Sequence, residues 1–278
     1  MMIMNKNFLK ILLVVFLVSC FPFSINADVG PKPSVKVTII DAPEGNYYVT
    51  LLCDEEQFGP WLRISNEEAQ DLGATDEEKE AVLAFMNYRD ADGYHFMGYF
   101  DECSKKEAFN WGYYAPKRFK IAIYSVDDQS LKISEAFERD AFEASYEVQY
   151  GDTLKVNEIS NLGRRLLLFA MRVLVTFAIE MVLALLFNLR SKKHLLTIFI
   201  VNLITQVTLN IAMMILEYSS GGFVWVIMFP ICELLITFFE LILYLIMFKD
   251  RPKWLIVIYT LLANGITMYL GMLSGFIS

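Results

Sequence analysis

Four long apolar runs occupy the chain from Leu166 towards its C-terminal end. Each is close to the roughly 20 residues that a helix needs to cross a bilayer. They predict membrane spans at about 166–189, 195–216, 223–248 and 254–273. The connections between them are short, so we expect a four-helix transmembrane bundle and an integral membrane protein.

Each predicted span also carries polar residues at helical spacing along one face. Ionisable and amide side chains are costly in hydrocarbon, so these faces should point towards one another inside the bundle. This expected intramembrane polar cluster comprises Arg172, Glu180, Asn202, Gln206, Asn210, Glu233, Glu240 and Asn264. From the helical rise of about 1.5 Å per residue, the side chains expected near the midplane are Glu180, Gln206, Glu233 and Asn264.

Two interpretations of the polar cluster remain open. In the first, amides and protonated glutamates hydrogen-bond across helices and set their register, each bond contributing about 1 kcal/mol or less. In the second, Glu180, Glu233 and Glu240 titrate in a proton or cation relay, or line a polar cavity for a small solute. Three carboxylates against one arginine leave an excess negative charge, which a low-dielectric interior resists by protonation or by admitting a cation.

The first 27 residues are typical of an export signal. Lys6 and Lys10 flank its start, and residues 11–18 form an apolar core that is short for a membrane span. Cleavage after Ala27 would remove the segment. The alternative is lipidation of Cys20, because Leu-Val-Ser-Cys at 17–20 resembles a lipobox.

Charge separates the remainder into two domains and orients them. Residues 28–160 contain 27 Asp and Glu against 13 Lys and Arg, which disfavours nucleic acid as a partner. Residues 161–278 contain 5 acidic and 9 basic residues, and the loops at 190–194 and 249–253 are basic. By the positive-inside rule, both loops are cytoplasmic. Residues 28–160 and the C-terminus are therefore expected outside the plasma membrane.

The domain at 28–160 is expected to be rich in β-structure. Predicted strands lie at 35–40, 47–53, 94–100, 118–126, 131–134 and 142–150. The turn residues at 43–46 predict a hairpin between the first two strands. Ser65 with Glu68, and Thr75 with Glu78, have the spacing of helix capping boxes. The predicted class is thus an α+β membrane protein, with an extracytoplasmic β-sandwich-like domain containing a helical insert, followed by the four-helix transmembrane bundle.

Little in the chain indicates catalysis. Cys53 and Cys103 lie in a domain expected to be exported, where they either form a disulfide or remain two buried free thiols. Neither a serine-hydrolase motif nor a histidine pair for zinc is present, and phosphate-binding loops are absent. We therefore expect no enzyme activity, no cofactor and no metal site.

Three segments carry a resemblance to other proteins: residues 27–35 (ADVGPKPSV), residues 138–142 (ERDAF) and residues 202–210 (NLITQVTLN). With these segments the chain resembles a group of uncharacterised membrane proteins of Gram-positive bacteria. The resemblance implies a signal peptide, an extracytoplasmic domain beginning near the GPKPS motif and four C-terminal transmembrane helices. It implies no activity and no catalytic residues.

Together these features favour a non-enzymatic sensor or accessory protein. Its outer domain would bind a ligand or partner, and the bundle would anchor it. The alternative is a small transporter or ion-conducting component that uses the buried glutamates. Beyond the lipid bilayer, the candidate partners are another membrane protein or a second copy of the chain, and the sequence identifies no extracellular ligand.

Overall fold

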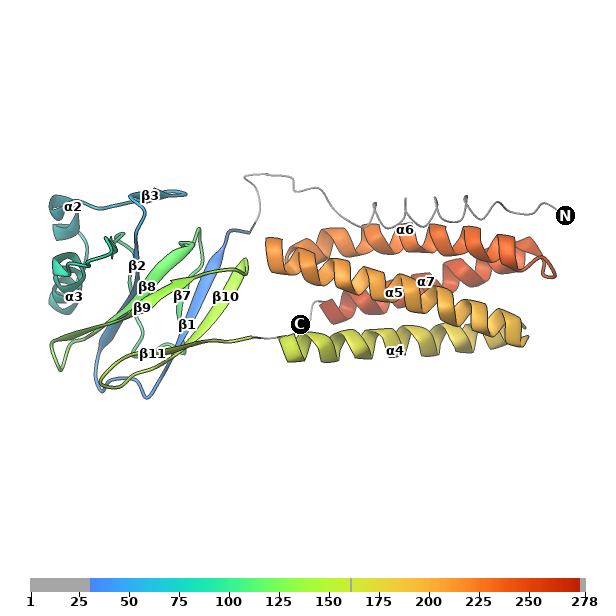
Figure 1. Ribbon diagram of the computed structural model, residues 1–278, viewed down its shortest axis with the longest axis horizontal. Coiled ribbons are helices and arrows are strands. Elements are labelled where there is room, and N and C mark those ends of the chain that lie inside the picture. Colours follow the sequence, from blue (N-terminus) through green and yellow to red (C-terminus); the bar gives the residue numbers. More distant parts are fainter. Residues whose placement is uncertain (1–30, 161, 276–278) are drawn as a thin grey trace. The chain divides into compact units, whose positions relative to one another are not determined.

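Figure 1 shows the computed structural model, which describes residues 31–160 and 162–275. The chain divides into two compact units with a boundary between Ser160 and Asn161. We call them the β-rich unit and the helical unit. The predicted signal segment at 1–27, with its lipidation alternative at Cys20, lies outside the described residues.

The β-rich unit contains the strands and two short helices. The strands are β1 Ser34–Ile40, β2 Tyr47–Cys53, β3 Gln57–Phe58, β4 Trp61–Leu62, β5 His95–Phe96, β6 Asp101–Glu102, β7 Phe109–Trp111, β8 Arg118–Ser125, β9 Ser130–Glu138, β10 Glu143–Gln149 and β11 Lys155–Glu158. The helices are α2 Asn66–Gln70 and α3 Asp76–Asn87.

Two sheets pack face to face in this unit. One has the order β11-β10-β1-β7, and the other has the order β5-β2-β8-β9, with β6 also paired to β2. Strands β1 and β10 pair in parallel, with Val37 opposite Tyr146. Buried side chains from both sheets, including Leu51, Trp111 and Ile121, form one core. The expected α+β class with a β-sandwich-like domain is confirmed.

Strand β2 lies at the centre of this arrangement because it is buried on both faces. Val49 and Leu51 belong to the core between the sheets. Tyr48 and Leu52 alternate with them and pack with Phe85 of α3 in a second core. Helix α3 therefore covers the opposite face of the second sheet, and both predicted capping boxes are present.

The predicted hairpin between the first two strands is wrong. Strand β1 pairs with β10 and β7, whereas β2 pairs with β8, β5 and β6. The turn at 43–46 instead carries the chain from one sheet to the other. Both strands have a face in the inter-sheet core, so sheet packing, which is non-local, decides their partners. The expected strand at 94–100 is also reduced to His95–Phe96.

The helical unit consists of four long helices. They are α4 Leu162–Leu186, α5 Lys192–Ser220, α6 Val224–Met247 and α7 Lys253–Gly275. In Figure 1 they run alongside one another. Each packs against its neighbour in sequence, and α7 also packs against α4, which closes the bundle.

The surface of the bundle is apolar, and its interior holds polar side chains beside two apolar clusters, unlike a water-soluble bundle. Large hydrophobic side chains such as Leu167, Leu174 and Phe238 are more than 60% exposed. Buried positions include glutamates, asparagines and threonines. All four helices are long and apolar enough to cross a bilayer. The chain is therefore a multi-pass membrane protein whose helices contact lipid.

Candidate functional site

The polar residues predicted from the sequence meet inside the helical unit. Glu180 and Glu240 are fully buried, and Glu233 is 2% exposed. Seven of the eight predicted side chains are buried, and Arg172 is half-buried. The polar faces of the helices therefore point towards one another. Their side chains form three groups along the bundle.

The first group surrounds Glu180 of α4. Asn202 of α5 donates hydrogen bonds through its Nδ2 to Glu180 Oε2 and, over 3.1 Å, to Tyr244 Oη of α6. The Tyr259 hydroxyl of α7 donates to Glu180 Oε2 over 3.4 Å. This group thus ties all four helices together around one carboxyl group.

The second group surrounds Glu240 of α6. Thr205 Oγ1 of α5 donates to Glu240 Oε1 over 2.7 Å. Asn264 Nδ2 of α7 donates to Glu240 Oε2 over 2.9 Å. Both carboxyl oxygens accept a hydrogen bond, so the residue is well suited to holding α5, α6 and α7 in register.

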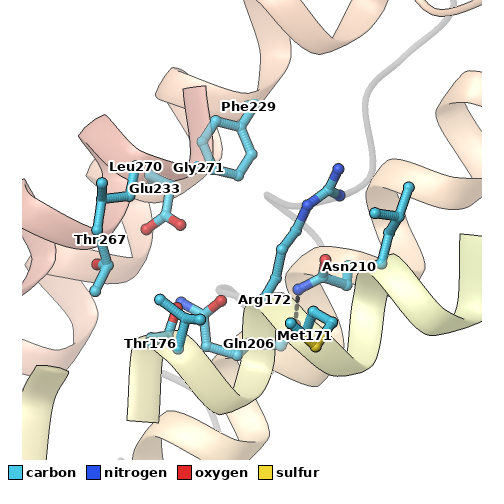
Figure 2. A pocket seen from close by; sticks show the side chains of 12 residues that line it. Met171, Arg172, Thr176, Gln206, Asn210, Phe229, Glu233, Thr267, Leu270 and Gly271 are labelled. Atoms are coloured by element: carbon cyan, nitrogen blue, oxygen red, sulfur yellow. Dashed lines mark hydrogen bonds between the residues drawn. The ribbon is translucent and has the colours of Figure 1, made fainter. Parts of the chain in front are cut away.

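The third group lines a pocket of about 170 Å³ between the four helices. Figure 2 shows Glu233 and Thr267 on one side of it, with Arg172, Thr176 and Gln206 opposite. The rest of the lining is mainly apolar, and it includes Leu168, Met171, Val175, Phe229 and Leu270.

Three buried polar atoms at this pocket make no hydrogen bond of 3.5 Å or less. They are Arg172 Nε, Gln206 Nε2 and Glu233 Oε2, from α4, α5 and α6. Among the described residues, no ion pair joins Arg172 to a carboxylate within 4.0 Å. The arginine instead lies over the Trp225 ring, with Cζ 4.4 Å from the ring centroid. Unpaired polar atoms are costly in a buried site, so the pocket offers unused hydrogen-bonding capacity.

Phe229 forms part of the pocket wall by packing on Gly271. A Cβ atom at position 271 would overlap the Phe229 ring, so glycine is required for this close approach. Trp225 also stacks on Phe229, with ring centroids 4.3 Å apart. Pro230 follows directly inside α6, where it removes one helical hydrogen bond and permits a local bend.

A further polar contact lies at the opposite end of the bundle from the pocket groups. His194, which the sequence placed in a loop, is the third residue of α5 and is 1% exposed. Its Nε2 lies 3.0 Å from Asp250 Oδ1 in the loop before α7. This hydrogen bond lowers the pKa of the Asp250 carboxyl. The His194–Asp250 hydrogen bond therefore links the α4–α5 connection to the α6–α7 connection.

The expected layer of four midplane residues divides between these groups. Glu180 bonds to Asn202, and Asn264 bonds to Glu240, so both lie at a different depth from Gln206 and Glu233. Counting residues inward from the ends of the apolar runs therefore does not give one common layer, because the axial offsets between packed helices decide which residues meet.

Two contributors to the network were missed in the sequence. Thr205 and Tyr259 are both fully buried and bond to glutamates. Tyrosine is common at lipid interfaces, so the residue type of Tyr259 alone did not predict a buried contact. Thr205 directly precedes Gln206, and its residue type likewise did not predict a contact with a glutamate.

The predicted cysteine pair remains as two free thiols. Cys53 ends β2, whereas the Cys103 amide donates to the Tyr47 carbonyl at the start of that strand. Six residues of strand span about 20 Å, and a disulfide requires Cα atoms within about 7 Å. The disulfide alternative is therefore ruled out by geometry, since both cysteines lie in the same core at opposite ends of β2.

The described residues contain no group of three or more His, Cys, Asp and Glu side chains that could hold a metal ion. Comparisons with protein-family models, with curated proteins and with solved structures find no match. The family resemblance inferred from the three short segments therefore stays a prediction.

Proposed function

We propose that this is a non-enzymatic membrane binding protein whose helical unit holds a small solute in the pocket between α4, α5, α6 and α7. The observation that carries the proposal is the set of three unpartnered buried polar atoms, on Arg172, Gln206 and Glu233, around one pocket. Glu180 Oε1, Asn202 Oδ1 and Asn264 Oδ1 also lack a partner, but the other polar atom of each of these side chains bonds to a neighbouring helix. Residues that served only to join helices would pair in this way, as both carboxyl oxygens of Glu240 do with Thr205 and Asn264.

In this proposal the β-rich unit lies outside the cell and meets a ligand or protein partner. The orientation is supported by the basic loops at 190–194 and 249–253 and by the predicted signal segment. The bundle anchors the protein and couples solute binding to a membrane partner, which is another membrane protein or a second copy of the chain. The resemblance to four-span membrane proteins of Gram-positive bacteria agrees with a plasma-membrane location.

The test is whether a water-soluble thiol reagent reaches the pocket. Thr176 lines the pocket and Thr197 does not, yet both are helical threonines that are 8% exposed. Each is changed to cysteine in a chain whose four native cysteines are serine, and the membranes are treated with a positively charged methanethiosulfonate. We expect modification of the Thr176→Cys protein and not of the Thr197→Cys protein. Equal protection of both would show that no aqueous solute reaches the pocket.

A transporter or ion-conducting component is the second candidate. It is favoured by the succession of polar groups beyond the pocket, from Glu233 to Glu240 and on to Glu180. Flux of protons or small cations into liposomes containing the protein would support it, provided that Glu240→Gln abolishes the flux. A binding protein without transport would show reagent access at position 176 but no flux above that of protein-free liposomes.

A further inference from the structure

Two groups that can carry opposite charges line the pocket without pairing with each other. Arg172 belongs to α4 and Glu233 to α6, and each has a buried side-chain atom without a partner. Among the described residues, no contact of 4.0 Å or less joins the two groups. Figure 2 shows the Glu233 carboxyl group and the Arg172 guanidinium apart from each other at the pocket.

The charge balance restricts what can bind there. An uncompensated charge in low-dielectric surroundings is costly, and removal of one partner of a buried pair leaves such a charge behind. A ligand with one charge would compensate one of the two groups and leave a net charge in the pocket. A ligand with one charge of each sign compensates both and keeps the pocket neutral.

The apolar part of the pocket lining restricts the rest of the ligand. Leu168, Met171, Val175 and Leu270 contribute only apolar surface. A volume of about 170 Å³ is near the ~150 Å³ cavity that holds benzene in an engineered protein. The body of the ligand should therefore be a short hydrocarbon segment.

We propose that the ligand is a small zwitterion with an aliphatic body, whose carboxylate binds Arg172 and whose ammonium binds Glu233. Gln206 Nε2 supplies a further donor to the ligand, and Phe229 covers the hydrocarbon segment. This inference rests on the proposed solute-binding function and specifies the ligand class of the same pocket.

The experiment measures binding to the full chain in lipid nanodiscs by titration calorimetry. The zwitterionic probes are leucine, 5-aminopentanoate and 6-aminohexanoate, which differ in the separation of their charges. Their single-charge counterparts are 3-methylbutylamine and 4-methylpentanoate for leucine, pentylamine and pentanoate for 5-aminopentanoate, and hexylamine and hexanoate for 6-aminohexanoate. We expect one zwitterion to bind at least tenfold more tightly than either single-charge compound of matching length.

The pocket variants assign each end of the ligand. In Glu233→Gln, the zwitterion should lose its preference over the carboxylate, and in Arg172→Gln it should lose its preference over the amine. A purely structural role of either residue would weaken all probes together. Asp250→Asn is the matched control, because Asp250 pairs with His194 over 3.0 Å at the other end of the bundle and does not line the pocket. Its affinities should equal those of the wild type.

The outcomes separate this inference from the function on which it rests. If the amine or the carboxylate binds as tightly as every zwitterion, and position 176 is reagent-accessible, the pocket binds solutes but the zwitterion assignment is wrong. If no probe binds and position 176 is protected, both proposals are wrong. Zwitterion binding that survives unchanged in both pocket variants would also overturn the assignment.

Discussion

At the residue scale, the buried glutamates differ in how well their oxygens are satisfied. Glu240 accepts from Thr205 and Asn264, whereas Glu233 Oε2 has no partner. A glutamine has one acceptor and one amide donor in place of two acceptors. The same substitution should therefore have opposite consequences at the two positions.

We predict that Glu240→Gln lowers the free energy of unfolding by about 1–2 kcal/mol, because the new amide donor faces an existing donor. Glu233→Gln should leave stability unchanged or raise it, because it removes a buried carboxyl oxygen that lacks a partner. Thermal unfolding of the purified variants in one detergent provides the measurement. Equal destabilisation of both would show that Glu233 also joins helices.

The free thiols of the β-rich unit lead to a second residue-scale prediction. Burial raises the pKa of the Cys53 thiol to about 11 and that of the Cys103 thiol to about 12. At pH 8 both should stay protonated and resist iodoacetamide until the unit is unfolded. Mass spectrometry after alkylation with and without guanidinium measures this. Rapid labelling of the folded protein would contradict the core position of either thiol.

The acidic turn at 90–93 leads to a third prediction. The Asp90 side chain is 2% exposed and accepts from Lys120 Nζ over 2.7 Å. Burial by itself would raise its pKa, but the hydrogen bonds from Lys120 and Tyr88 outweigh that effect and lower it. Asp90→Asn should reduce the free energy of unfolding by about 2–3 kcal/mol at pH 7.

The pH dependence of the free energy of unfolding tests the Asp90–Lys120 pair. A carboxyl whose pKa is lowered by folding stabilises above its unfolded value of about 3.9 and loses that contribution as the pH falls through the folded value. The difference between wild type and Asp90→Asn should therefore shrink below about pH 4. A difference that is constant from pH 7 to pH 3 would assign the loss to packing instead.

At the element scale, the helical insert of the β-rich unit depends on its caps. Thr75 accepts from the Glu78 amide over 3.1 Å, and Glu78 Oε2 accepts from the Thr75 amide over the same distance. Helix α3 then places Phe85 against β2 and β8. The cap at the start of α3 therefore stabilises the helix whose apolar face packs on the sheet.

We predict that Thr75→Ala lowers the free energy of unfolding by about 1 kcal/mol, because the cap loses its side-chain acceptor. Thr75→Ser is the control and should retain most of the stability, since the hydroxyl is kept. Chemical denaturation followed by circular dichroism measures both. A loss of equal size in the serine variant would point to the threonine methyl group rather than to the cap.

At the scale of the whole molecule, the main prediction is the orientation in the membrane. Lys155 is exposed at β11 and Lys249 is exposed in the loop after α6. Each is changed to cysteine in the cysteine-free chain and treated with a membrane-impermeant maleimide. In intact cells we expect labelling at 155 only, and labelling at 249 after permeabilisation. The reverse pattern would invert the proposed topology.

Helix and strand patterns in the sequence indicated much of this protein because they are local. The apolar runs located four membrane helices, and the residue types at Ser65–Glu68 and Thr75–Glu78 predicted both capping boxes. Polar spacing also identified the interior face of each span. Periodicity reports which side of an element is buried, and it does so without knowledge of the partner.

Only the tertiary structure decided which residues meet. The parallel pairing of β1 with β10, the separation of Cys53 from Cys103 and the bonds of Glu180 to Asn202 and Glu240 to Asn264 all join segments distant in sequence. Rotation and axial offset of packed helices set such contacts, and a shift of one turn exchanges the partners. For the same reason, the pocket that leaves Arg172 and Glu233 unpaired has no counterpart in any local pattern of the sequence.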